Sequence, residues 1–134
     1  MTIDIGNNSN VANINGKLEK VISYWLQLTK PFNNLIDSEI AVLSRILYYR
    51  TIYAKNISDE TALNIYTLST SSRAQIKNSL TMDTSRFEIH LSNLRKKGII
   101  IGKDGFNKAY IPNIDLDTRS YKVLFNFNII DAEE

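Results

Sequence analysis

The sequence predicts an α+β domain of three or four helices and a β-hairpin, with a further strand expected near each end. Three observations support this prediction. Apolar residues recur at spacings of three and four between Ile40 and Tyr53, as on a helix. A basic run followed by Gly98 marks the end of a later helix. The dipeptide Asp104-Gly105 lies between two apolar runs, as in a tight hairpin.

The two ends of the chain are expected to differ from the middle. Residues 1–16 are rich in Asn, Ser and Gly and predict a flexible N-terminal arm. Residues 17–28 mix β-branched and aromatic side chains in near alternation, which favours a strand over the competing interpretation, a helix. Residues 121–130 alternate more cleanly and also predict a strand, and 131–134 form an acidic tail. The aromatic side chains expected to be buried by these strands are Trp25, Phe125 and Phe127.

Between the ends, capping residues separate helices within a single domain that spans 17–130. Asp37 and Asp59 are the expected N-caps of the first two helices, and Asp83 or Thr84 caps the last. The sequence Lys30-Pro31-Phe32-Asn33-Asn34 predicts a turn. The expected helices cover 37–53, 60–68, 71–80 and 84–97.

The order helix, helix, turn, helix, glycine and hairpin occupies residues 59–112. Within it, Leu91-Ser92-Asn93-Leu94-Arg95-Lys96-Lys97-Gly98-Ile99-Ile100 resembles a recognition helix that enters the first strand of a wing. Residues 69–101 as a whole resemble the winged helix-turn-helix superfamily of bacterial and phage regulators. The resemblance implies that 84–97 is the recognition helix and that the 99–111 hairpin is the wing. Winged helices bind DNA and also serve as protein-interaction modules.

Charge is unevenly distributed along the chain. The net charge is only +2, yet residues 69–110 hold eight basic and three acidic side chains. A local basic excess is the expected footprint of a surface that binds nucleic acid. The alternative is an ordinary solvated surface.

Helical periodicity divides the last helix into two faces. Phe87, Leu91 and Leu94 share one face and are expected to pack on the preceding helices. The opposite face is expected to reach base edges in the major groove, with Ile89 against a thymine methyl group. If the helix does not bind DNA, these residues are solvated and Ile89 contacts the core or a partner. The candidate base-contacting residues are Ser85, Arg86, Ile89, Asn93 and Lys96.

Four further cations are candidate phosphate contacts. Arg73 and Lys77 lie one turn apart on the helix that crosses the DNA backbone in this fold. Lys103 and Lys108 flank the expected wing tip, where wings lie over the backbone or the adjacent minor groove in proteins that this chain resembles. Each contact would make the affinity more dependent on salt.

The sequence carries no constellation of residues that favours catalysis. The chain has no cysteine, and its only histidine, His90, lies at the margin of the buried helix face. The carboxylates are dispersed, and neither a phosphate-binding glycine loop nor a G-x-S-x-G elbow is present. We therefore expect no catalytic residue, metal or cofactor. No apolar run reaches the roughly 20 residues that span a bilayer.

Two functions are consistent with these features. The first is a cytoplasmic DNA-binding protein, a transcriptional regulator that recognises duplex DNA. The second is a structural or adaptor component of a phage particle or of a replication or packaging assembly. Its strands 17–28 and 121–130 would then form a homodimer or dock into a larger assembly. The high Asn and Ile content suggests an AT-rich genome, so a phage origin would place the protein in the host cytoplasm or the virion.

Overall fold

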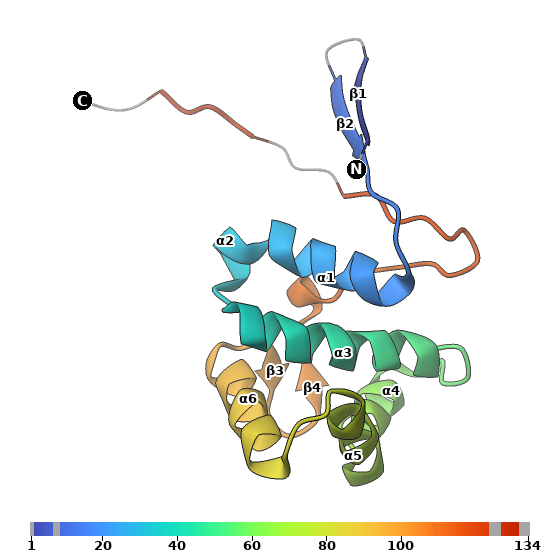
Figure 1. The fold of residues 1–134 in the computed structure, drawn as a ribbon, viewed down its shortest axis with the longest axis vertical. Helices are drawn as coiled ribbons and strands as arrows, with labels where there is room; N and C mark the ends of the chain where they lie inside the picture. The colour runs from blue at the N-terminus through green and yellow to red at the C-terminus, as the bar shows by residue number, and fades with distance from the viewer. Residues whose placement is uncertain (1, 7–8, 124–126, 132–134) are drawn as a thin grey trace.

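Helix α3 (Asp37–Tyr53) lies in the middle of the molecule, between two layers (Figure 1). One layer contains α1 (Leu18–Leu28) and the short helix α2 (Lys30–Asn33). The other layer contains α4 (Glu60–Thr67), α5 (Thr70–Ser79), α6 (Thr84–Lys96), β3 (Ile100–Ile101) and β4 (Gly105–Phe106). The computed structural model describes residues 2–6, 9–123 and 127–131, and these form an α+β fold.

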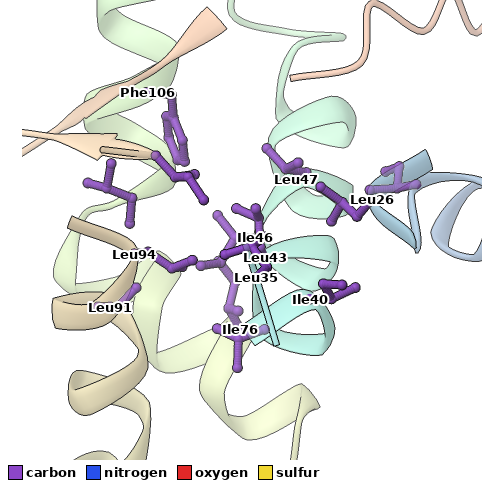
Figure 2. Close-up of a cluster of buried hydrophobic side chains, with 14 of the residues drawn as sticks. Leu26, Leu35, Ile40, Leu43, Ile46, Leu47, Ile76, Leu91, Leu94 and Phe106 are labelled. Carbon is purple, nitrogen blue, oxygen red and sulfur yellow. The ribbon is translucent and has the colours of Figure 1, made fainter. Parts of the chain in front are cut away.

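The core is centred on α3 because this helix is covered on both sides. A helix that is enclosed in this way needs apolar side chains around most of its circumference. Figure 2 shows Leu26 of α1 against one side of α3, and Leu94 of α6 and Phe106 of β4 on the other. The buried residues that α3 itself contributes to the core are Ile40, Val42, Leu43, Ile46 and Leu47.

The prediction of a strand at 17–28 is wrong, because residues 18–28 form helix α1. Ile22, Trp25 and Leu26 are buried against α3, and Leu18 packs beside them. Their spacing of three and four is that of one helix face. The near alternation in this short segment is compatible with a strand or a helix. The helix is favoured because it buries Ile22, Trp25 and Leu26 together against the neighbouring α3.

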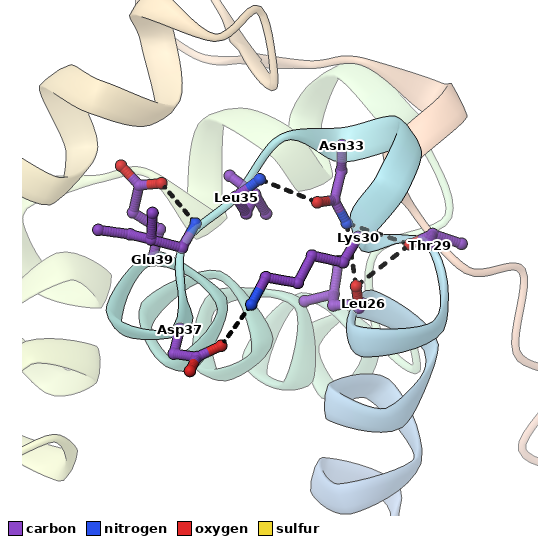
Figure 3. Close-up of polar contacts among 8 residues, drawn as sticks. Leu26, Thr29, Lys30, Asn33, Leu35, Asp37 and Glu39 are labelled. Carbon is purple, nitrogen blue, oxygen red and sulfur yellow. Dashed lines mark hydrogen bonds and ion pairs between the residues drawn. The ribbon is translucent and has the colours of Figure 1, made fainter.

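A buried asparagine fixes the corner between α1 and α3 (Figure 3). The Asn33 Nδ2 group donates to the Leu26 carbonyl oxygen at 3.0 Å and to Thr29 Oγ1 at 3.1 Å. Its Oδ1 atom accepts from the Leu35 backbone N–H at 3.0 Å. The predicted turn at 30–34 is therefore a helical turn, α2, which ends with Asn34 in the left-handed conformation at φ 57°. The Asn33 amide can be buried at little cost because its polar atoms are hydrogen-bonded to these partners.

Helix α3 starts where predicted, but Asp37 is its first helical residue and Ile36 occupies the N-cap. The Asp37 carboxylate pairs with Lys30 Nζ at 2.9 Å, and this contact lowers the pKa of Asp37. The Glu39 carboxylate accepts from the Ile36 backbone N–H at 3.1 Å (Figure 3). Glu39 therefore satisfies a free N–H at the helix start, which Asp37 was expected to do.

Helices α4 and α6 of the second layer begin at the predicted caps. The Asp59 carboxylate accepts from the Ala62 N–H at 2.8 Å, and the Asp83 carboxylate accepts from the Arg86 N–H at 2.8 Å. Ser69 caps α5 through its hydroxyl. Each contact satisfies one of the N–H groups that a helix start leaves without a partner.

The hairpin forms around the predicted turn but is shorter than expected. Ile100 pairs with Phe106 and Ile101 with Gly105, across a three-residue loop. The residues after β4 form a 3-10 turn, η1 (Lys108–Tyr110), which Asn107 caps by accepting from the Ala109 N–H at 3.1 Å. The return strand predicted to extend to Ile111 therefore stops after Phe106.

The chain ends also differ from expectation. The arm at 1–16 contains two antiparallel strands, β1 (Thr2–Gly6) and β2 (Ser9–Asn13), which project from the helices (Figure 1). The strand predicted at 121–130 is not found in residues 121–123 or 127–131, and Phe127 is 87% exposed instead of buried. Because 18–28 is helical, this segment provides no strand with which 121–130 could pair. Phe125 lies outside the described residues.

Candidate nucleic-acid interface

Helices α5 and α6 are joined by a tight turn whose geometry depends on Thr81. The Thr81 N–H donates to the Asn78 carbonyl at 3.1 Å, and the Met82 N–H donates to the Lys77 carbonyl at 3.3 Å. These two bonds form a Schellman motif, which requires a left-handed residue at the position of Thr81. Thr81 adopts φ 53°, an uncommon conformation for a β-branched residue. The turn thus directs α6 away from α5 within four residues.

The inner face of α6 is buried as predicted. Phe87, Leu91 and Leu94 are buried in the core, and His90 lies beside them. Burying each large apolar side chain stabilises the fold by about 1.5–3 kcal/mol. His90 Nδ1 has no hydrogen-bond partner among the residues that the structure describes. The three apolar anchors therefore fix the rotation of α6 about its own axis.

The outer face of α6 carries the candidate base-contacting residues. Ser85, Arg86, Ile89 and Lys96 are exposed, and Asn93 is half-buried. Ile89 is 59% exposed, in the middle of this otherwise polar face. Within the described part of the chain, the side chains of Arg86 and Lys96 make no ion pair. These two cations are consequently available to a ligand.

The two candidate cations of α5 are engaged with α6. Arg73 Nη1 lies 3.3 Å from a Glu88 carboxylate oxygen, and Lys77 Nζ donates to Thr84 Oγ1 at 2.9 Å. Both side chains bridge the two helices of the helix–turn–helix. Glu88, one of the three acidic residues counted in 69–110, partly cancels the positive charge of this surface, and its pairing with Arg73 was not predicted.

The wing turn is held in place by α6. The Arg95 guanidinium donates to the carbonyl oxygens of Gly102 at 3.2 Å and Lys103 at 3.5 Å. The left-handed residue of this turn is Gly102, at φ 64°, although Asp104-Gly105 was the expected position. Gly105 matters for another reason, since a Cβ atom there would lie 2.7 Å from the Ile101 carbonyl oxygen. Lys103 is exposed in this turn, near the C-terminal end of α6.

Lys108 does not flank the wing tip. It lies in η1, beyond the short strand β4, and its Nζ atom is 3.2 Å from a Glu60 carboxylate oxygen at the start of α4. The prediction assumed a return strand extending to Ile111, which would have placed Lys108 beside the tip. Because the chain turns after Phe106, Lys108 is separated from the outer face of α6.

Lys97 has a structural contact that the sequence did not suggest. Its Nζ atom lies 2.5 Å from a Glu39 carboxylate oxygen and donates to the Asn34 carbonyl at 2.8 Å. Glu39 is only 2% exposed. Burial acts to raise the pKa of Glu39, but hydrogen bonds from Lys97 and from the Ile36 N–H outweigh it and leave the pKa below its ordinary value. The pair anchors the C-terminal end of α6 to α3.

The described residues contain no group of three or more His, Asp or Glu side chains that could hold a metal ion. None of the helices in the described part of the chain is both long and apolar enough to span a bilayer. The arrangement is that of an α+β domain that presents one helix and a short hairpin on its surface.

Comparisons with protein-family models, with curated proteins and with solved structures find no match to this chain. Its function is therefore inferred from its own residues and their geometry.

Proposed function

We propose that residues 59–112 form a winged helix-turn-helix and that α6 binds duplex DNA in the major groove. One observation carries the proposal: buried Phe87, Leu91 and Leu94 hold α6 so that Arg86 and Lys96 face outward. A helix presented in this way, after a short turn and before a hairpin, matches the geometry by which such domains read DNA. The proposed role is a transcriptional regulator in the cytoplasm.

The candidate contact residues of α6 each have a chemistry suited to a part of the duplex. Arg86 lies in the first turn of α6, where a guanidinium can contact guanine O6 and N7. Ser85 and Asn93 offer hydrogen-bonding groups for base edges, and Ile89 offers an apolar surface for a thymine methyl group. Lys96 and Lys103 are suited to the phosphate backbone.

Arg73 and Lys77 have a second proposed role, which is structural. Their contacts to Glu88 and Thr84 connect α5 to α6, so they position the recognition helix. Either cation can also approach a phosphate if its present contact is exchanged. Lys108 is paired to Glu60 away from this face, so we leave it out of the proposed interface.

A second candidate function is protein binding by the same face, as a structural or adaptor component. The specific observation that favours it is Ile89, which is exposed at the centre of the outer face of α6. The Arg73–Glu88 pair also reduces the net positive charge available to DNA. Both functions use the same rigid presentation of α6.

Fluorescence anisotropy with a random-sequence duplex, at low and moderate salt, separates the two functions. We expect micromolar binding that weakens steeply with salt, because each phosphate contact contributes about one unit to the logarithmic salt slope. The variant Arg86→Ala with Lys96→Ala should lower the affinity about tenfold or more. The matched control is Lys55→Ala with Lys122→Ala, which removes the same charge from exposed positions elsewhere.

An equal loss of affinity in the control variant would show that only net charge matters and would overturn the assignment of α6. Absence of binding at low salt by the folded wild-type protein would overturn DNA binding and favour the adaptor role.

A further inference from the structure

Helix α1 carries a stripe of exposed residues on the side away from the core. It is basic at the N-terminal end of the helix and apolar at the other end. Its apolar side chains remain largely accessible, and Phe32 on α2 continues the four-residue spacing with 68% exposure. The outer stripe, as we define it, consists of Lys17, Lys20, Tyr24, Leu28 and Phe32.

The C-terminal segment has the complementary composition. Phe127 and Ile129 are 87% and 95% exposed, and Ile130 beside them is also open to solvent. In sequence, an acidic run that includes Asp131 and Glu133 follows directly. Figure 1 shows the described part of this tail leaving the helical body. Apolar side chains exposed in series on one segment indicate a surface that is covered in the functional state.

We propose that the tail of one copy docks on the outer stripe of a second copy, giving a reciprocal, two-fold symmetric dimer. Phe127 and Ile129, which share one side of an extended chain, cover Leu28 and Phe32 together with Tyr24. The carboxylate of Asp131 reaches Lys20, with Lys17 one turn further along the helix. The tail therefore runs antiparallel to α1.

The dimensions and charges of the two surfaces fit each other. Helix geometry places Lys20 and Leu28 about 12 Å apart along α1. An extended chain from Phe127 to Asp131 covers about 13 Å. The Asp131 carboxylate then meets Lys20 at one end, while apolar side chains meet at the other. Lys17 and Lys20 make no ion pair within the described residues, so their charges are free for such a contact.

A second copy is favoured over other occupants of the stripe. The tail does not lie on its own α1, as the exposure of Phe127 and Ile129 shows. Two reciprocal contacts bury both tails at once, which a single association with another protein would not achieve. The stripe and α6 belong to layers on opposite sides of α3, so the dimer leaves α6 accessible (Figure 1).

The test measures the mass of the full chain in solution by light scattering, and it needs no DNA. We expect the wild-type protein to be dimeric. Leu28→Asp with Phe32→Asp disables the stripe, and Phe127→Asp with Ile129→Asp disables the tail. Each double variant alone should be monomeric. An equimolar mixture should regain part of the dimer, because the intact tail of one variant meets the intact stripe of the other and restores one of the two contacts.

The control Ile65→Asp introduces one such negative charge at an exposed apolar position on α4 and should leave the dimer intact. The recovery of dimer in the mixture also shows that both variants are folded. A monomeric wild-type protein at every concentration would overturn the proposal, and it would point to docking of the tail on its own chain or on another partner. Double variants that remain dimeric, or a mixture that stays monomeric, would overturn it as well.

Discussion

Helices α5 and α6 end in the same backbone motif but with different residues. At the end of α6, Gly98 takes the left-handed position at φ 75°, and the Ile99 N–H donates to the Leu94 carbonyl at 3.0 Å. At the end of α5, Thr81 takes the equivalent position at φ 53°. Glycine adopts this conformation freely, whereas a residue with a Cβ atom loses roughly 1–2 kcal/mol there. The turn that aims α6 is therefore the strained one of the two.

The two ends also differ in how they are anchored. Lys97 fixes the end of α6 to buried Glu39, and Lys77 fixes the end of α5 to exposed Thr84. We infer that the buried Lys97–Glu39 contact positions the C-terminal end of α6. The strained turn at Thr81, before the N-terminal end of α6, is held in place by α5 and α6 on either side of it.

The largest expected effect comes from removing the buried anchor. Lys97→Ala leaves the Glu39 carboxylate buried without its charge partner, which should lower the free energy of unfolding by about 2–3 kcal/mol. This figure lies below that for a fully buried pair because a quarter of the Lys97 side chain is exposed. Lys77→Ala, the control at the other end, should cost less than about 0.5 kcal/mol. Urea denaturation of the two variants checks this, and equal losses would remove the distinction between the anchors.

The same anchor predicts a dependence of stability on pH. The pKa of Glu39 in the folded protein lies below its ordinary value of 4.5, since the hydrogen bonds from Lys97 and from the Ile36 N–H outweigh burial. This stabilisation is present above pH 4.5 and is lost as the pH falls through the lowered pKa. Glu39→Gln should therefore be less stable than the wild-type protein at neutral pH, with a difference that shrinks in acid. Denaturation midpoints measured over this pH range test the sign, and a constant difference would contradict it.

Gly98→Thr should make the end of α6 resemble the end of α5. A Cβ atom at Gly98 meets no atom within 4 Å, so the cost arises from the backbone conformation alone. We expect a loss of about 1–2 kcal/mol in unfolding free energy. Thermal unfolding followed by circular dichroism measures it. An unchanged midpoint would indicate that the left-handed conformation carries no cost here.

The converse substitution has the smallest expected effect and the opposite sign. Thr81→Gly relieves the left-handed strain but gives the unfolded chain more freedom, so the net gain should be about 0.5–1 kcal/mol. Thr81→Ala, which retains a Cβ atom without branching, is the matched control and should gain less. Destabilisation by Thr81→Gly would show that the threonine side chain supports the turn through contacts that outweigh its strain.

The two helix ends also explain what could be predicted from the sequence. Gly98 after three basic residues is a local signal, and so are the caps Asp59 and Asp83, so these boundaries were found. The inner face of α6 was found for the same reason, because helical periodicity is a local property. Thr81 gave no such signal, since a threonine does not indicate a left-handed backbone.

Features that depend on distant contacts were missed. Lys97 and Glu39 lie 58 residues apart, and only the packing of α6 against α3 brings them together. Helix α1 was predicted as a strand because its local pattern fits both structures until α3 covers one side. Lys108 was assigned to the wing because the predicted return strand was too long, and the pairing of Arg73 with Glu88 could not be read from spacing alone.

The most direct test of the account is an amide NMR titration of the protein with a short random-sequence DNA duplex. We expect chemical-shift changes centred on Ser85, Arg86 and Ile89 of α6, extending to Lys96 and to the wing turn at Lys103. We also expect α1 to remain unaffected. Shift changes confined to α1 or the C-terminal tail, or none at low salt, would contradict the claim that α6 is the DNA-binding surface.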